Sequence, residues 1–380
     1  MSTMLIECSC GEVYPANEQD VGGWLRCRCG RIVRVGSSQA RPRAHTSTPW
    51  IIRLSWGYLA LALVACASLW ALADRWWPAT LFLFGPRWVL LLPLAALIPL
   101  ALKRRAPLLL IPLTIGGAIV LFPVMGLRLG SLSRAGSDEG AATLRVVTLN
   151  TDGALGPALD LPFRLEEWRA DIVALQECGD VLQAIVVGLE GWHRQATQQM
   201  CVLSRYPIRS TAVTNWNDLE AARERGIGGS SQAVSHVIET PHGPIQFVNL
   251  HLETPRKGLE GLFELDIRRV AENTTLRAIE SRRTRDWLQE ATGSVIIAGD
   301  FNMPVESTIY RKDWAGFRNA FSDAGVGFGM TRDNGWIRVR IDHILTGDHW
   351  RARRVSVIPG VGLDHRPVVA ELMWVGPPYE

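Results

Sequence analysis

The sequence predicts an α/β layered domain over residues 144–380, preceded by about three transmembrane helices and a small N-terminal segment that contains four cysteines. Three patterns support this prediction. Short apolar segments alternate with amphipathic segments after residue 144, long apolar runs precede them, and a Cys-x-Cys-Gly sequence occurs twice within the first 30 residues. We expect the chain to divide into residues 1–35, a linker at 36–50, a transmembrane region at 51–128, a tether at 129–143 and the α/β domain.

The N-terminal cysteines form two matching pairs separated by 16 residues, Cys8-Ser-Cys10-Gly11 and Cys27-Arg-Cys29-Gly30. Four thiolates held by two tight turns satisfy tetrahedral zinc, and each Gly lets the backbone fold back and donate to sulfur. Because so small a segment cannot bury a sufficient core, bound metal would supply its folding free energy. The alternatives are two disulfides or a basic tail without metal. We favour zinc in an arrangement that resembles a zinc ribbon, which would bind a cytoplasmic partner or serve only as a folded cap.

Two apolar runs are long enough to cross a bilayer whose hydrocarbon core is about 30 Å thick. The first, residues 51–73, contains Arg53 as its only charge, and the second, residues 106–127, contains no charge. Between them, residues 88–102 are apolar but short. This segment reaches spanning length if it begins near Ala79 and tolerates Arg87, or if nearby tryptophans lie at the membrane interface. We therefore predict three spans, with helices of a soluble core as the alternative.

The basic residues around the spans predict their orientation. Six Arg precede the first span and Lys103-Arg104-Arg105 lies between the second and third, whereas the first connection offers only Arg75 and Arg87. The positive-inside rule then places the N-terminus in the cytoplasm and residue 130 onward outside. A cytoplasmic N-terminus also keeps the cysteine pairs reduced, which favours metal over disulfides. We expect no signal peptide, because about 50 mostly polar residues precede the first span.

The α/β domain is predicted from its apolar segments. The long helix covers residues 267–289 and a shorter one covers residues 181–189. The predicted strands are residues 144–149, 172–176, 201–204, 233–238, 245–250, 295–298, 341–345 and 368–372. The formal net charge of the chain is +3, but residues 144–380 carry 26 Lys and Arg against 30 Asp and Glu. This domain therefore has no bulk electrostatic reason to bind nucleic acid.

Polar residues recur where the predicted strands end. Asp300 and Asn302 follow the strand 295–298, and their i, i+2 spacing directs both side chains to one side of extended chain. Any one such residue could be a strand-end cap or part of an Asx turn. The recurrence favours a site instead, since these residue types bind hard divalent ions and transfer protons. The set comprises Asn150, Glu177, His251, Asp300, Asn302, Asp342, Asp364 and His365.

These stretches together resemble a known superfamily. In chain order, the motifs that resemble the endonuclease/exonuclease/phosphatase superfamily, with its deoxyribonuclease I-like fold, are Val147-Thr-Leu-Asn150, Leu175-Gln-Glu177, Leu203-Ser-Arg-Tyr-Pro-Ile208, Asn249-Leu-His251, Gly299-Asp-Phe-Asn302, Ile341-Asp-His343 and Asp364-His-Arg-Pro367. The resemblance implies a four-layered α/β sandwich with its site at one end of two packed sheets. Members include nucleases, inositol polyphosphate phosphatases and sphingomyelinases, so the fold does not determine the substrate.

The resemblance also implies roles for the metal and the proton carriers. Glu177 would be the main ligand of Mg²⁺ or Mn²⁺, with Asn150 beside it. His365 would take a proton from the attacking water, and Asp364 or Asp342 would orient its imidazole. One departure from many relatives is Leu363, where they have Ser before the Asp, and we expect little consequence.

The remaining roles concern the phosphoryl group. Asp300 and Asn302 would position the water and the transition-state oxygens, and His251 would donate to the phosphoryl group or the leaving oxygen. Two segments without clear periodicity, residues 211–232 and 253–266, are candidates to overhang the site. In the second, Arg256 and Lys257 would clamp a phosphate or form an ordinary solvated loop.

Two questions stay open from the sequence. The first is whether Cys178 and Cys201 pair, which requires a Cα spacing that the sequence does not show.

The second open question is the substrate. Membrane-anchored bacterial members of the superfamily, some proposed to act on polyprenyl-phosphate lipids, resemble this chain. A tether of about 15 residues confines the site to a few tens of Å from the bilayer. We therefore favour a Mg²⁺-dependent phosphoesterase at the outer leaflet, with a surface-tethered nuclease and a non-catalytic membrane scaffold as alternatives.

Overall fold

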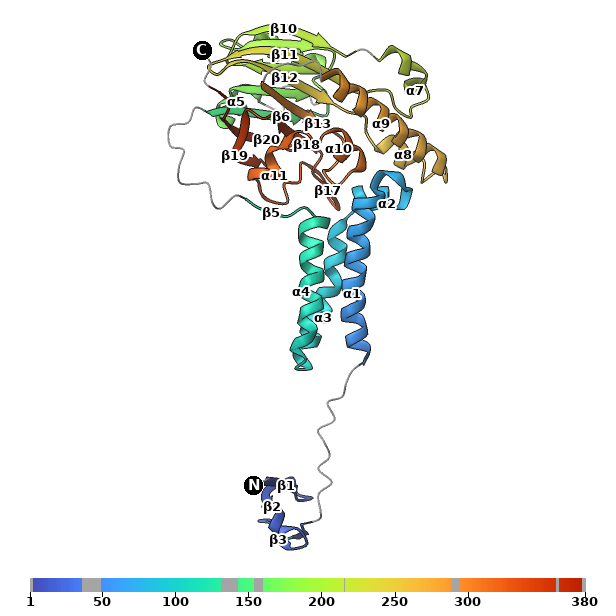
Figure 1. Cartoon of the computed structure of the whole chain (residues 1–380), viewed down its shortest axis with the longest axis vertical. Coiled ribbons are helices and arrows are strands. Elements are labelled where there is room, and N and C mark those ends of the chain that lie inside the picture. The colour runs from blue at the N-terminus through green and yellow to red at the C-terminus, as the bar shows by residue number, and fades with distance from the viewer. Residues whose placement is uncertain are drawn as a thin grey trace. The chain divides into compact units, whose positions relative to one another are not determined.

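The computed structural model describes residues 3–35, 49–130, 143–153, 160–214, 216–288, 294–359 and 362–377 (Figure 1). The chain divides into two compact units, Met1–Leu54 and Ser55–Glu380. The first unit contains two antiparallel hairpins. One joins β1 (Thr3–Glu7) to β2 (Val13–Asn17), and the other joins β3 (Trp24–Arg26) to β4 (Ile32–Arg34). Most of the predicted linker, residues 36–48, lies outside the described residues.

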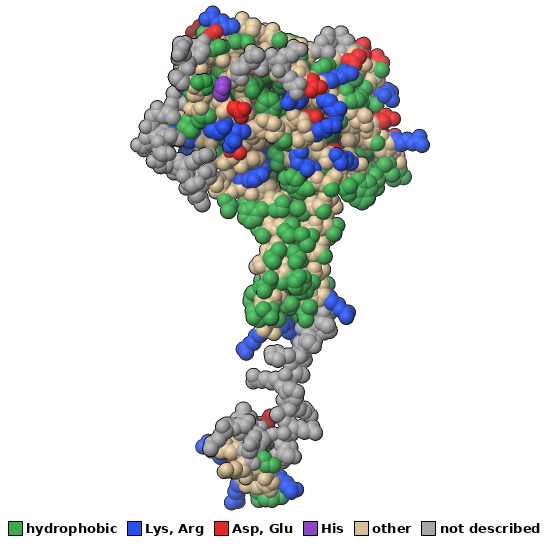
Figure 2. All heavy atoms as spheres, viewed as in Figure 1, with side chains coloured by type: hydrophobic (Ala, Val, Ile, Leu, Met, Phe, Trp, Pro, Cys, Tyr) green, Lys and Arg blue, Asp and Glu red, His purple; other side chains and the backbone are tan. Residues whose placement is uncertain are grey.

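The apolar runs form helices. They are α1 (Pro49–Ala67), α2 (Trp77–Phe84), α3 (Leu92–Lys103) and α4 (Leu110–Ile119). With the irregular turns that extend α1 and α4, the helical segments Trp50–Arg75 and Pro107–Val124 are long and apolar enough to cross a membrane. Figure 2 shows apolar side chains covering the surface of these helices. Because only 28% and 39% of the two segments is buried, the helices do not resemble those of a soluble core.

The middle hydrophobic segment is bent, so a continuous helix that starts near Ala79 is not what the structure contains. Trp77–Phe84 and Arg87–Lys103 meet at 87° and form one span only if the bent pair is counted together. The first of these helices, α2, contacts the α/β domain through the long helix α9 (Ile267–Leu288) and the short strand β17 (Ile337–Val339). The bend occurs at Gly85-Pro86, where Pro cannot donate the backbone hydrogen bond that a continuing helix needs.

Residues 143–377 form two six-stranded sheets with helices on both outer faces. The first sheet has the order β19 (Trp350–Val357), β20 (Val368–Trp374), β6 (Thr143–Asn150), β7 (Ile172–Gln176), β9 (Met200–Ser204) and β8 (His193–Thr197). The second has the order β10 (Ile208–Val213), β11 (Gln232–Thr240), β12 (Gly243–His251), β13 (Ser294–Asp300), β18 (Asp342–Thr346) and β14 (Arg318–Asn319).

Three apolar clusters separate four layers. The central cluster joins the two sheets and includes Ile172, Phe247 and Ile296. A second lies between the first sheet and helices α5 (Leu161–Trp168) and α6 (Asp180–Gly188). A third lies between the second sheet and helices α9 (Ile267–Leu288) and α10 (Thr308–Asp313). Strands covered on both faces are continuously apolar, as in β7, where every residue is buried. The prediction of a four-layered α/β sandwich is confirmed.

The strand register brings distant polar residues to one edge. Parallel pairing of β12 with β13 places His251 opposite Asp300, and antiparallel pairing of β13 with β18 places Asp300 opposite Asp342. In the other sheet, β6 and β7 run parallel, so that Asn150 pairs with Gln176, the residue before Glu177. The candidate residues therefore meet because the strands that carry them end together.

Each predicted strand is present within a residue or two of its expected bounds, but four strands of the two sheets were missed. Strands β8 and β10 are mostly exposed, β19 mixes buried and exposed residues, and β14 has only two residues, so no apolar run marks them. The long helix ends at Leu288, and its predicted end at residue 289 lies outside the described residues. In addition, the last residue of the predicted transmembrane region and the first residue of the predicted tether form β5 (Arg128–Leu129), which pairs with β15 (Val326–Gly327). Residues 131–142 lie outside the described residues.

The α/β domain contacts the long apolar helices through buried polar groups. These contacts connect the two parts in addition to the tether. Asp74, at the end of the first helical segment, forms an ion pair of 3.4 Å with Arg277 of α9. Its carboxylate also accepts hydrogen bonds from Ser307 Oγ at 2.6 Å and Thr308 N at 2.8 Å. A second ion pair joins Arg87 to Glu306 at 3.2 Å.

Candidate active site

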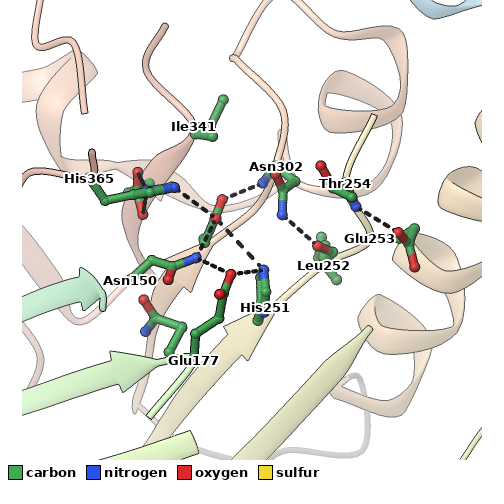
Figure 3. A network of polar contacts seen from close by, with 12 residues as sticks. Asn150, Glu177, His251, Leu252, Glu253, Thr254, Asn302, Ile341 and His365 are labelled. Carbon is green, nitrogen blue, oxygen red and sulfur yellow. Dashed lines mark hydrogen bonds and ion pairs between the residues drawn. The ribbon is translucent and has the colours of Figure 1, made fainter. Parts of the chain in front are cut away.

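The polar strand ends converge in a cavity of about 180 Å³ (Figure 3). Asn150 Nδ2 donates to Glu177 Oε1 at 2.9 Å and to Asp300 Oδ2 at 3.0 Å, which links the two sheets. His251 Nε2 lies 3.6 Å from Glu177 Oε1 and 3.8 Å from Asp300 Oδ2. These four side chains therefore form one network, with Glu177 partly exposed to the cavity and Asp300 fully buried beneath it.

His365 lies on the other side of Asp300. Its Nδ1 is 3.0 Å from Asp342 Oδ2, and its Nε2 is 3.8 Å from Asp300 Oδ2. Burial lowers the pKa of His365, but the carboxylates of Asp342 and Asp300 outweigh burial and raise it to about 9. With a proton on Nδ1 directed at Asp342, Nε2 is the nitrogen available to accept a proton.

Of the two carboxylates expected to orient His365, Asp342 is the one in contact. Burial raises the pKa of Asp342, but His365 and a hydrogen bond from Thr331 hold it below its ordinary value. Asp364 instead forms an ion pair of 2.7 Å with Arg332. The guanidinium of Arg332 also lies 3.1 Å from His365 Nε2, so Asp364 reaches the histidine only through this arginine.

Two residues of the site, Asn302 and Glu177, have left-handed backbone conformations. Asn302 and Glu177 both have φ of +50°, which is uncommon for residues other than Gly. Asn302 N donates to Asp300 Oδ1 at 2.7 Å, while its side chain donates to Leu252 O. A Cβ on Gly299 would lie 1.9 Å from Leu250 O, so only Gly permits β12 and β13 to approach this closely.

Two residues at this site were missed from the sequence. Arg332 lies in the short strand β16 (Arg332–Asn334), far along the chain from its partners and without a local pattern. Asp152 also lines the cavity, and its i, i+2 spacing from Asn150 was a signal that could have identified it. Burial raises the pKa of Asp152, and the nearby carboxylates of Asp364 and Glu177 raise it further.

The carboxylates fit a divalent cation. Asp152, Glu177 and Asp300 line one cavity, and burial together with Asp342 raises the pKa of Asp300 as well. A cation bound among them would favour their ionised forms. Asn150 directs its nitrogen at Glu177 in this structure, and rotating the amide by half a turn would present its oxygen, a suitable ligand for Mg²⁺ or Mn²⁺.

The two candidate phosphate clamps lie at the cavity but have different surroundings. Lys257 forms an ion pair of 2.9 Å with the buried Glu253 and donates to Ser230 Oγ at 2.8 Å. Arg256 is exposed, with an ion pair of 3.8 Å to Glu260. Both residues belong to α8 (Arg256–Glu260). The segment 253–266 therefore borders the site, whereas the segment 211–232 contributes Ser230 to its lining.

A disulfide joins Cys178 to Cys201, with the Cα atoms 6.0 Å apart. It links the residue after Glu177 to β9, and both cysteines are fully buried. This answers the question that the sequence left open.

The N-terminal cysteines converge in the other unit. Their sulfur atoms all lie within 4.8 Å of one another, and no disulfide joins them. The amides of Gly11 and Gly30, which have φ near +90°, close the two turns by donating to the carbonyls of Cys8 and Cys27 and not to sulfur. Four thiols at this spacing fit a zinc ribbon.

The chain belongs to the Endonuclease/Exonuclease/phosphatase family, whose model matches residues 147–365. Among solved structures, it is similar to TDP2 of D. rerio complexed with a single-strand DNA product, with 13% identity, a TM-score of 0.45, and coverage of 61% of this chain and 99% of that one. A mannosyl-6-phosphatase of Bacteroides thetaiotaomicron has 15% identity, a TM-score of 0.44, and coverage of 61% and 100%. No curated protein matches this chain.

We predict that Asp342 sets the pH dependence of the reaction. If His365 accepts a proton, the rate rises with pH as His365 deprotonates, up to about pH 9. Asp342→Asn removes a carboxylate that raises the pKa of His365, so the acidic limb of the kcat profile moves to lower pH and kcat falls roughly 10²–10⁴-fold. A water-soluble phosphodiester serves as the substrate. Asp364→Asn is the control and leaves the limb in place, and a limb that Asp342→Asn also leaves in place would contradict this role.

We also predict that the purified full chain contains about one zinc ion, because four thiolates satisfy one tetrahedral site. Elemental analysis measures the metal content. Cys10→Ser lowers it, whereas Cys66→Ser, which removes a thiol in the first helical segment, does not. Equal zinc in both variants would locate the metal elsewhere.

Proposed function

We propose that this protein is a membrane-anchored, divalent-metal-dependent hydrolase that acts on phosphorylated lipids at the outer membrane leaflet. Family membership establishes the coarser class, the hydrolysis of phosphoester bonds. The proposal that the substrate is a membrane lipid rests on contacts that connect the active site to the helices. Arg277 Nη2 donates to Asn302 O at 3.1 Å, and Arg277 Nη1 contacts Asp74 at 3.4 Å. A single side chain thus separates the active-site loop from the end of the first candidate span.

The residues suggest how hydrolysis proceeds. His365 Nε2 takes a proton from water as the water oxygen attacks phosphorus and the bond from phosphorus to the leaving oxygen breaks, and Asp342 stabilises the resulting imidazolium. Asp300, 3.8 Å from His365 Nε2, positions that water. His251 donates to a phosphoryl or leaving oxygen on the opposite side of Asp300. A Mg²⁺ or Mn²⁺ held by Glu177, with Asn150 and Asp152 beside it, would neutralise phosphate charge.

Arg332 contributes a positive charge beside His365. Its guanidinium now contacts His365 Nε2 and Asp364, and a substrate phosphate in the cavity would attract it away from the histidine nitrogen. Arg332 would then stabilise the phosphoryl oxygens and leave Nε2 free to accept the proton.

The cysteines support the orientation. The disulfide between Cys178 and Cys201 is of a kind that persists in oxidising compartments, whereas the four N-terminal thiols are unpaired, as expected in the cytoplasm. This agrees with the positive-inside count, which leaves the N-terminus inside and the α/β domain outside. The zinc-ribbon-like segment would then face a cytoplasmic partner.

The test uses the full chain reconstituted in lipid nanodiscs, with either a polyprenyl pyrophosphate in the bilayer or plasmid DNA in solution. We expect Mg²⁺-dependent phosphate release from the lipid and an intact plasmid. Glu177→Ala and His365→Ala each lower the rate roughly 10²-fold or more. The matched control is Glu371→Ala, which removes a partly buried carboxylate of β20 that pairs with Arg145 and Arg353, away from the substrate cavity, and leaves the rate unchanged.

Two outcomes would contradict the proposal. Metal-dependent nicking of the plasmid without phosphate release would identify a tethered nuclease. Silence on both substrates would favour the membrane scaffold.

A further inference from the structure

A second cavity, of about 210 Å³, lies between the helices and the α/β domain. One wall comes from the helical region and includes Arg87, Trp88 and Met125. The opposite wall comes from the α/β domain and includes Phe328, Met330 and Arg340. One water molecule occupies about 30 Å³ of liquid, so this space accommodates a larger group. The lining combines apolar side chains with three arginines and a single carboxylate, that of Glu306, which favours an amphipathic anion as the ligand.

Arg340 is buried in this wall without a charged partner. Arg340 is 6% exposed, and it forms no ion pair with any of the described residues. Its Nη1 donates to Phe328 O at 3.3 Å, its Nε has no hydrogen-bond partner, and the guanidinium lies over the ring of Phe321. Burial lowers the pKa of Arg340 to about 10, so the group stays charged at neutral pH. A buried guanidinium without an ion-pair partner is energetically unfavourable unless a counterion binds to it.

The nearby carboxylate of Glu306 favours the charged form of Arg340 but forms its ion pair with another arginine. Glu306 is paired with Arg87 at 3.2 Å. Arg87 also donates to Leu83 O and Val124 O, which holds it in place beside Glu306. Arg338, at the cavity, shares the carboxylate of Asp333 with Arg366. Positive charges at the cavity therefore outnumber negative ones, and Arg340 is the lining arginine that forms no ion pair with any described residue.

Aromatic residues beside the cavity place it at the depth of a membrane interface. Trp88 stacks on Trp336 with ring centroids 5.7 Å apart, and its Nε1 donates to Trp336 O. Trp336 is 74% exposed and lies in the turn between β16 and β17 (Ile337–Val339), which sits against the ends of the helices (Figure 1). Tryptophan is enriched at this depth in membrane proteins. Leu92, 58% exposed at the start of α3, offers an apolar surface for acyl chains.

We propose that this cavity binds the phosphate of an anionic membrane lipid, with Arg340 as its charged ligand and the lipid tails along α3. The inference rests on the proposed membrane anchoring but not on catalysis. The cavity is separate from the active site, because the residues that line the two do not overlap.

The experiment measures which lipids the full chain retains. The protein is equilibrated in nanodiscs that contain equal amounts of phosphatidylglycerol and phosphatidylcholine, released into detergent and weighed by native mass spectrometry. We expect one retained phosphatidylglycerol. Arg340→Gln lowers its retention about tenfold, the effect of losing one charge-assisted hydrogen bond. Met125→Trp lowers it as well by filling the cavity, with every charge left in place. The matched control Arg209→Gln removes an exposed arginine of β10 that pairs with Glu239 and retains the lipid.

Three outcomes would overturn this proposal. Retention of phosphatidylglycerol that neither cavity variant lowers would place the lipid elsewhere. Equal retention of phosphatidylcholine would remove the selection for an anion. Equilibrium dialysis that shows inorganic phosphate binding to the lipid-free protein as tightly as phosphatidylglycerol, and lost in Arg340→Gln, would make this a free-phosphate site. Lipid retention requires no turnover, so the binding result can be interpreted even if the proposed hydrolysis is not observed.

Discussion

The structure depends on one buried guanidinium, that of Arg277. Its side chain is 1% exposed and contacts Asp74 from the helices, Asn302 O from the active-site loop and Glu253 O from the segment that borders the substrate cavity. Burial lowers the pKa of Arg277, and the carboxylate of Asp74 opposes this effect and favours the charged guanidinium. Removing one partner of such a pair typically costs about 3–5 kcal/mol. The contacts of Arg277 therefore couple the position of the helices to that of the catalytic loop.

The second constraint is the register of the strands that end at the site. His251, Asp300 and Asp342 sit opposite one another on β12, β13 and β18, and Gly299 permits the close approach of β12 and β13. The disulfide after Glu177 and the positive φ of Glu177 itself fix the facing strand end in the other sheet. The carboxylates are thus held together by the fold itself, an arrangement that would allow a hard divalent ion to bind without large rearrangement.

Much of this was predictable from the sequence, because apolar runs mark buried strands and polar residues at their ends mark the site. The α/β layered domain and the convergence of Asn150, Glu177, Asp300 and His365 belong to this class, whereas the four layers followed from the resemblance to the superfamily. What the sequence did not predict depends on long-range pairing. Asp74 meets Arg277 across 203 positions, and Arg332 meets His365 across 33. The strand β10 was missed because its side chains are largely exposed. Local patterns carry no information on such contacts.

The most direct test of the account compares two hydrolysis rates in the same nanodisc, one for a lipid phosphate within the bilayer and one for a water-soluble phosphodiester. Asp74→Asn weakens the link between the helices and the domain without altering any group in the substrate cavity. Since a misplacement of about 1 Å can cost as much as 10²-fold in rate, the account predicts that the lipid rate falls at least about tenfold more than the soluble rate. Equal changes in both rates would contradict the claim that docking onto the helices presents the active site to membrane lipids.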